Sequence, residues 1–141
     1  MRTAYRVRQV VNAVNLSTLL GLALARTSGA RLSSGPDGLV VATGVTRPLL
    51  AASAYTVGNV VIVRVPTLTP ELLRHEGRHA THWACCVLLF LPLYGLAALW
   101  SHARAGDPWS RNAFEVRAGL DEGGYLEAPL RPIWTRRTGQ V

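Results

Sequence analysis

The chain has 141 residues, of which 49% are hydrophobic and 16% are charged. This length and composition predict one globular domain over residues 1–141 and exclude an intrinsically disordered protein. The formal net charge is +7, and every Lys or Arg position is an arginine. Apart from the adjacent Arg136 and Arg137 the arginines are dispersed, which indicates no specific nucleic-acid site but leaves an anionic membrane surface open as a partner.

The first predicted element is an N-terminal helix within residues 1–30, roughly from Ala4 to Arg26. Its apolar stretch follows three arginines, a pattern shared with signal peptides and membrane anchors. Asparagine, serine and threonine residues interrupt this stretch, and no clear small-residue cleavage site follows it. We therefore expect an amphipathic or buried helix. A Gly/Ser-rich loop is predicted after it, over residues 27–38.

Residues 38–66 predict a small β-sheet. The segment Gly38–Val45 is typical of one short strand, and the β-branched run Tyr55–Arg64 is typical of another. Gly58 and Asn59 interrupt that run, which indicates either a hairpin turn or a bulge.

A helix is predicted over residues 67–91, with Thr69 as its N-cap and Pro70 at its first position. It carries the sequence His75-Glu76-Gly77-Arg78-His79, which fits the zinc-protease pattern H-E-x-x-H. Residues four apart share a helix face, so both imidazoles can hold one zinc ion while the Glu76 carboxylate reaches a water on that ion. The alternative is a polar surface helix that contains two histidines by chance.

The apolar stretch Ala84–Trp100 overlaps the end of this helix and is about as long as the shortest membrane-spanning helices. Because Pro92 interrupts it, we expect a turn at Pro92 and a second short helix, with a membrane-associated surface as the alternative. The neighbouring Cys85 and Cys86 are expected to be buried in a reducing compartment, which favours a cytoplasmic location.

A short ligand helix is predicted over residues 110–120, capped by Ser110 or Asn112. The residues from 127 to 141 are rich in proline and arginine and predict an irregular tail. Helices and a small sheet in this order predict an α+β domain of zincin type: N-terminal helix, short sheet, H-E-x-x-H active-site helix and C-terminal ligand helix.

Two parts of the chain resemble a known family. The strand Tyr55–Val63 followed by Leu72–His79 resembles compact bacterial gluzincin-type metallopeptidase domains, including one associated with extracellular contractile injection systems. Such domains place a Thr-x-Gly-Asn strand before an H-E-x-x-H helix. The segments Phe90–Leu96 and Asn112–Glu115 are similar to a related group of short bacterial proteins. The resemblance covers about residues 55–125, and it departs at His82, where glutamine is frequent.

Two histidines leave zinc short of the three protein ligands usual in catalytic sites. The resemblance implies a glutamate from a later helix, and Glu115 matches that position. Two alternatives stay open. Asn112 and Glu115 also fit a capping box, in which the carboxylate bonds to the Asn112 amide. His82 lies on the same helical stripe as His75, although we expect it to hydrogen-bond to a ligand or to pack.

The motif and the resemblance together predict a zinc metallopeptidase that hydrolyses peptide bonds, with Zn²⁺ as cofactor and a peptide or protein as substrate. Glu76 is the predicted general base for a zinc-activated water. The alternatives are a zinc-stabilised interaction module and a membrane-associated scaffold with little or no turnover.

Further residues are candidates for supporting roles. A strand edge at residues 60–63 is expected to pair with an extended substrate. Asp121 is a candidate partner for a ligand histidine, with a loop or surface charge as the alternative. Three side chains are candidate oxyanion donors: Tyr125, Tyr94 and Arg78. Loop or surface positions are expected for the remaining polar residues: His102, Asp107, Glu122 and Glu127.

Overall fold

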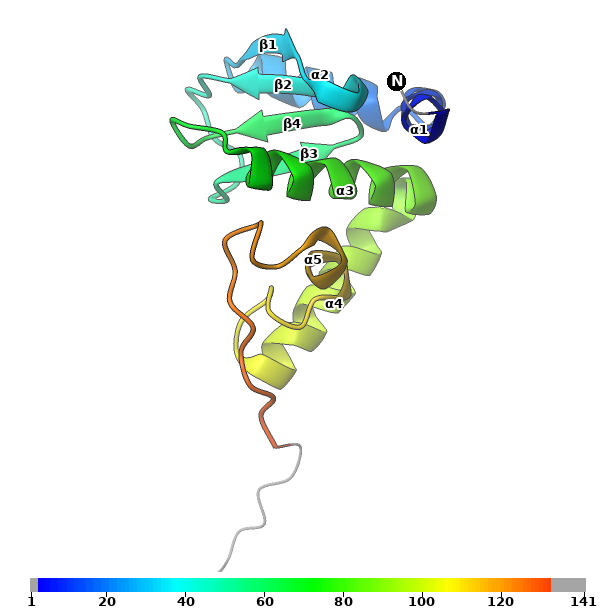
Figure 1. Cartoon of the computed structure of the whole chain (residues 1–141). Coiled ribbons are helices and arrows are strands. Elements are labelled where there is room, and N and C mark those ends of the chain that lie inside the picture. Colours follow the sequence, from blue (N-terminus) through cyan, green and yellow to red (C-terminus); the bar gives the residue numbers. More distant parts are fainter. Residues whose placement is uncertain (1–2, 133–141) are drawn as a thin grey trace, which may run out of the picture.

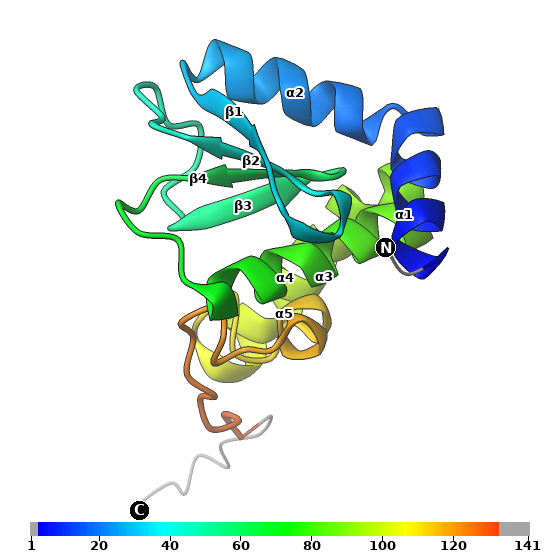
Figure 2. The same cartoon turned by 45° about the horizontal axis from the view of Figure 1, so that its top comes forward.

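The protein is an α+β domain, described by a computed structural model over residues 3–132. A four-stranded sheet lies between helix α2 and helix α3, and a lower layer of α4 and α5 continues beyond α3 (Figures 1 and 2). The helices are α1 Thr3–Val14, α2 Ser17–Thr27, α3 Pro70–Cys86, α4 Phe90–Ala105 and α5 Ala113–Ala118. The strands are β1 Arg31–Ser34, β2 Val40–Thr43, β3 Ala54–Val57 and β4 Val60–Val63.

The sheet is mixed, with the strand order β1-β2-β4-β3. The two outer pairs are antiparallel, whereas β2 and β4 run parallel. Alternate residues of β4 serve the two faces: Val60 and Ile62 pack with α2, and Val61 and Val63 pack with α3. Every residue of β3 and β4 is buried, so this hairpin forms the centre of the core. The hairpin predicted at Gly58-Asn59 is confirmed.

The single N-terminal helix predicted for residues 1–30 is wrong, because α1 and α2 meet at an angle of 75°. Leu16 between them adopts a left-handed conformation with φ 65°. The carboxamide oxygen of Asn15 accepts hydrogen bonds from both the amide and the hydroxyl of Ser17. These local side-chain bonds replace the backbone bonds of a continuous helix and bend the chain there.

Strand β1 lies inside the segment 27–38, which was predicted to be a loop. All four of its residues are exposed, so it lacks the alternation of apolar and polar residues that identifies a half-buried strand. It pairs antiparallel with β2 at one edge of the sheet and is held there by backbone bonds.

Helix α3 begins as predicted: Pro70 is its first residue, and the Thr69 side chain accepts a hydrogen bond from the Leu72 amide. It ends at Cys86, five residues before the predicted end. The turn is centred on Val87, which has φ 53°, and a short 3-10 turn η2 (Val87–Leu89) leads into α4. The turn predicted at Pro92 is therefore wrong. Pro92 lies in the first turn of α4, where a missing N–H costs no helical hydrogen bond.

Helix α4 has 16 residues, so the expected second short helix is a long one. The helical stretch Pro70–Ala105 contains an apolar window of 18 residues, which by length and composition could cross a membrane or belong to a core helix, and only 11% of that window is buried. Cys86 packs partly against the core, but Cys85 is exposed, which corrects the expectation that both are buried. Both cysteines are free.

Helix α5 is capped by Asn112, whose side-chain oxygen accepts a hydrogen bond from the Phe114 amide. The other candidate cap, Ser110, instead hydrogen-bonds to the Asp107 carboxylate. Residues 127–132 form neither helix nor strand, in agreement with the predicted irregular tail. The rest of that tail, with Arg136 and Arg137, lies outside the described residues.

Candidate metal centre

Three buried side chains from two helices meet between α3 and α5. His75 and His79 lie one turn apart on α3, and Glu115 lies on α5. The Nε2 atoms of the histidines are 3.1 Å apart, and Oε2 and Oε1 of Glu115 lie 3.2 Å from His75 Nε2 and 3.4 Å from His79 Nε2. One ligand atom from each residue fits within 4.8 Å of the others. The group could therefore hold a metal ion.

The Glu115 side chain does not form the capping box. The Asn112 amide donates to the Trp109 carbonyl instead, and the Glu115 carboxylate turns toward the histidines. Its Oε1 accepts a hydrogen bond from the Tyr94 hydroxyl at 2.5 Å, while Oε2 is buried and has no hydrogen-bond partner among the described residues. A buried carboxylate oxygen without a donor is costly unless a cation or proton compensates it, which fits a metal ligand.

The charge state of Glu115 supports the same conclusion. Burial alone would raise its pKa, but the adjacent imidazoles of His75 and His79 outweigh that effect and lower the pKa. Burial also raises the pKa of Tyr94, so its hydroxyl stays protonated and donates to the Glu115 carboxylate. The carboxylate is therefore ionised at neutral pH, as metal coordination requires.

The orientation of both imidazoles is set by a second contact. His75 Nδ1 lies 2.9 Å from the Gly119 carbonyl, which can only accept, so a neutral His75 carries its proton on Nδ1 and presents the Nε2 lone pair to the site. His79 Nδ1 lies 3.3 Å from His82 Nδ1. Burial and the neighbouring His79 lower the pKa of His82 to about 4, so His82 is neutral and can accept from His79. This contact matches the hydrogen-bonding role expected for His82.

Glu76 is 3% exposed and lines the same cavity as the three candidate ligands. Its Oε2 accepts a hydrogen bond of 2.7 Å from the hydroxyl of Thr56 on β3. Burial raises the pKa of Glu76 above the ordinary value of a carboxyl group, and the nearby His79 and the Thr56 hydroxyl oppose that shift. A buried carboxyl with a raised pKa beside candidate metal ligands is a candidate for proton transfer.

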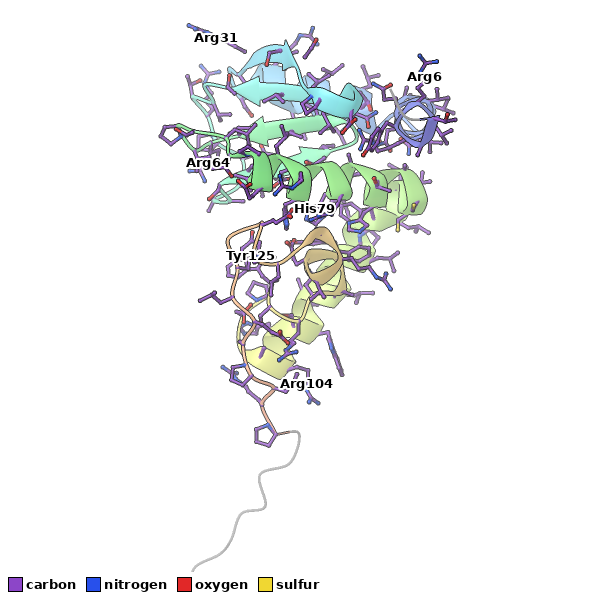
Figure 3. All side chains as sticks on the ribbon, viewed as in Figure 1. Arg6, Arg31, Arg64, His79, Arg104 and Tyr125 are labelled. Carbon is purple, nitrogen blue, oxygen red and sulfur yellow. The ribbon has the colours of Figure 1, made fainter. Side chains whose placement is uncertain are left out.

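A cavity of about 660 Å³ opens over these groups. In Figure 3, His79 lies on α3 and Tyr125 lies below it on the C-terminal segment. The cavity wall is mainly apolar and aromatic and includes Leu50, Phe90, Leu91, Tyr94, Trp109 and Tyr125. The Tyr125 ring stacks on Trp109, with ring centres 5.4 Å apart, and lies 6.2 Å from the ring centre of His75. A cavity of this size and lining can hold a few residues of another polypeptide beside the three candidate ligands.

Some supporting roles expected from the sequence are corrected. Strand β4, residues 60–63, is flanked by β2 and β3, so it presents no free edge; β3 is the edge strand beside the cavity. Asp121 is exposed, and the carbonyl of Gly119 takes the histidine contact proposed for it.

Of the three candidate oxyanion donors, two are engaged elsewhere. Arg78 donates to Glu122 and to the Ala118 carbonyl and lines a different pocket on the other side of α3. Tyr94 donates to Glu115. Among the three, Tyr125 lines the cavity, and its hydroxyl has no hydrogen bond within the described part of the chain, although its backbone amide donates to the Leu120 carbonyl.

The back of α3 is held by buried polar residues that the sequence reasoning left without a role. Asn12 donates to the Ala80 carbonyl at 2.8 Å and to the Asn59 side chain at 3.1 Å. Arg8 donates to the Gly77 carbonyl, and burial lowers the pKa of its guanidinium. In the sequence, these contacts were indicated only by the polar residues that interrupt the apolar N-terminal stretch.

No family model, curated protein or solved structure matches the chain. The interpretation of the site therefore depends on its own geometry and chemistry.

Proposed function

We propose that the chain is a zinc-dependent metallopeptidase of gluzincin type, with His75, His79 and Glu115 as zinc ligands and Glu76 as general base. The observation that carries the proposal is the convergence of two imidazoles and an ionised, buried carboxylate around one point, beside a second carboxyl group. The resemblance of residues 55–125 to gluzincin-type domains supports the same assignment.

Zinc is the metal that this donor set favours. Two imidazole nitrogens and one carboxylate oxygen match the protein ligands of catalytic zinc sites that keep one position open. Calcium and magnesium prefer sites made of oxygen ligands alone. The cavity beside the three ligands supplies the open position.

A bound zinc ion supplies a Lewis acid that lowers the pKa of water and polarises a peptide carbonyl. In the proposed reaction, the Glu76 carboxylate accepts a proton from the attacking water and returns it to the leaving amine. Thr56 holds Glu76 in place through Oε2. Retention of this carboxyl group favours catalysis over a structural metal site, which would not require it.

Tyr125 is the proposed donor to the carbonyl oxygen that becomes negatively charged. Burial, together with the nearby Glu115 and Glu76, raises the pKa of Tyr125 to about 12, so its phenol remains protonated at neutral pH. The edge of β3 that pairs with no other strand of the sheet is the proposed place for an extended substrate, held through backbone hydrogen bonds. Its residues Ala54–Val57 line the cavity beside Glu76.

The test combines metal analysis with a cleavage assay on the purified chain. We expect one zinc per chain in the wild type and in the control His102→Ala, which changes an exposed histidine outside the site. His79→Ala and Glu115→Ala are expected to lose zinc. Glu76→Gln is expected to keep zinc and to lose peptide hydrolysis. Full zinc occupancy in Glu115→Ala would contradict the ligand assignment.

The alternative of a zinc-stabilised interaction module predicts a different result: zinc bound as above, but no hydrolysis by the wild-type chain that Glu76→Gln removes. A scaffold protein with a chance motif predicts no stoichiometric zinc. For location, we propose the cytoplasm, consistent with two free cysteines, and a position at the membrane surface.

A further inference from the structure

An apolar surface lies where α1, the end of α3 and α4 meet. Two separate segments come together at the Trp83 carbonyl, which accepts hydrogen bonds from the Asn15 side chain and from the Val87 amide. The residues next to these donors are exposed. We define the junction face by five of them, with exposed fractions from 40% to 77%: Val14, Leu16, Val87, Leu88 and Leu89.

The junction face continues along both helices that leave it. Along α1 it extends through Val10 and Val7, which are 61% and 57% exposed. Along α4 it extends through exposed side chains at helical spacing, namely Leu93, Leu96 and Trp100. Both α1 and the α3–α4 junction lie on the right side of the molecule in Figure 1. This many exposed apolar side chains on neighbouring segments is unusual for a chain that is fully solvated.

The composition of this surface points to lipid as its partner. Protein interfaces are enriched in Tyr, Trp, Met and Arg at their centres, whereas the junction face consists only of Val and Leu. No Asp, Glu, Lys or Arg occurs from residue 79 to residue 103. At the far end of α4, the Arg104 guanidinium lies 5.5 Å from the centre of the Trp100 ring, a pair suited to a membrane–water interface.

Charge adds a second, independent argument. The first acidic residue of the chain is Asp37, so α1 carries no carboxylate; of its two arginines, Arg8 is buried and Arg6 is exposed. Arg6 is exposed on α1 and points outward beside it in Figure 3. A cationic, apolar helix surface is the combination that binds membranes containing anionic lipids.

We propose that the junction face docks on the surface of an anionic lipid bilayer, with α1 and the η2–α4 segment in contact with the headgroup and upper acyl region. The chain lies on the membrane and does not cross it, because Phe90 and Ser101 of α4 are buried against the rest of the domain. The proposal does not depend on catalysis.

The test is co-sedimentation of the purified full chain with vesicles of phosphatidylcholine alone or of phosphatidylcholine and phosphatidylglycerol. We expect binding to the anionic vesicles and much weaker binding to the neutral ones. Leu88→Ser/Leu89→Ser is expected to weaken binding at least about tenfold, since two leucine side chains leave the apolar region. Arg6→Gln is expected to weaken it about fivefold, the factor for one basic residue at an anionic surface.

Each variant has a matched control elsewhere on the molecule. Leu126→Ser/Leu130→Ser removes two leucines that are 88% and 53% exposed on the C-terminal segment, and Arg31→Gln removes an exposed arginine of β1. Both controls are expected to bind vesicles as the wild type does. Circular dichroism and zinc content should be unchanged in all variants.

Three results would overturn the proposal. The first is no sedimentation with anionic vesicles. The second is equal loss of binding in Leu88→Ser/Leu89→Ser and Leu126→Ser/Leu130→Ser. The third is self-association in analytical ultracentrifugation that Leu88→Ser/Leu89→Ser abolishes while vesicle binding is absent, which would assign the junction face to a second copy of the chain.

Discussion

The hydroxyl of Thr56 donates a hydrogen bond of 2.7 Å to Oε2 of Glu76, and both side chains are at least nine-tenths buried. Thr56 lies on the edge strand β3, and Glu76 lies on the helix that packs against it. The Thr56 carbonyl also accepts a hydrogen bond from the Trp83 indole, farther along the same helix. Thr56 of β3 therefore holds in position both helix α3 and the side chain of Glu76, the proposed general base.

Thr56→Val should change the pH dependence of the proposed reaction. The Thr56 hydrogen bond lowers the Glu76 pKa against the larger, raising effect of burial, so its loss raises that pKa further. Glu76 must be ionised to accept a proton, so the acidic limb of the kcat/KM profile should move to higher pH. Thr56→Ser keeps the hydroxyl and serves as the control. Identical profiles for Thr56→Val and wild type would show that the bond does not tune Glu76.

Tyr125→Phe should separate catalysis from metal binding. The substitution removes only the phenol oxygen, and the ring can still stack on Trp109. We expect unchanged zinc content and a fall in kcat of about 10²–10³-fold, the cost of losing one oxyanion donor. Tyr94→Phe is the companion variant, because it removes the donor to Glu115 and should lower zinc affinity about 10–100-fold. Unchanged kcat in Tyr125→Phe would exclude the donor role.

Gly123→Ala should weaken metal binding through steric contact alone. A Cβ at Gly123 would lie 2.5 Å from Cε1 of the His75 ring, closer than such atoms approach, so the ring must shift. We expect zinc affinity to fall about tenfold, comparable to the loss of a partner that orients a ligand. Gly95→Ala is the control, since a Cβ there meets nothing within 4 Å. Equal zinc affinity in both variants would show that the His75 orientation is not limiting.

The stabilisation of the fold by zinc should increase with pH, whereas the contribution of His75 to the stability of the metal-free chain should decrease. In the metal-free chain burial lowers the His75 pKa, but the adjacent Glu115 carboxylate and the Gly119 carbonyl prevail and the pKa is raised. A group whose pKa rises on folding stabilises the fold below its unfolded pKa of about 6.5, and that contribution disappears as the pH rises through the folded value. Glu115, whose pKa is lowered, stays ionised throughout this range.

Zinc binding requires neutral imidazoles, so its stabilisation increases over the same interval. The increase in Tm on adding zinc should therefore be larger at about pH 8 than at about pH 5.5, as measured by thermal unfolding with and without a chelator. His79→Ala should abolish this difference. A zinc effect that is constant across the range would contradict binding through the histidines.

The sequence by itself determined the features that local interactions control. The Thr69 cap and Pro70 start α3, and the spacing of His75 and His79 places both rings on one face of that helix whatever it packs against. The β-branched run around Gly58-Asn59 likewise predicts strand structure with either a hairpin turn or a bulge, and the structure has the hairpin. These elements were enough to predict an α+β fold.

Only the tertiary structure decided which way the Glu115 carboxylate turns. The pattern Asn112-x-x-Glu115 is compatible with a capping box, and the choice against it arises because α5 packs beside α3, where Tyr94 and the histidines meet the carboxylate. The position of β4 inside the sheet also depends on long-range pairing, since β2 joins it in parallel. Contacts between residues distant in the chain leave no pattern in the local sequence, so the packing of helices and strands in the folded domain decides them.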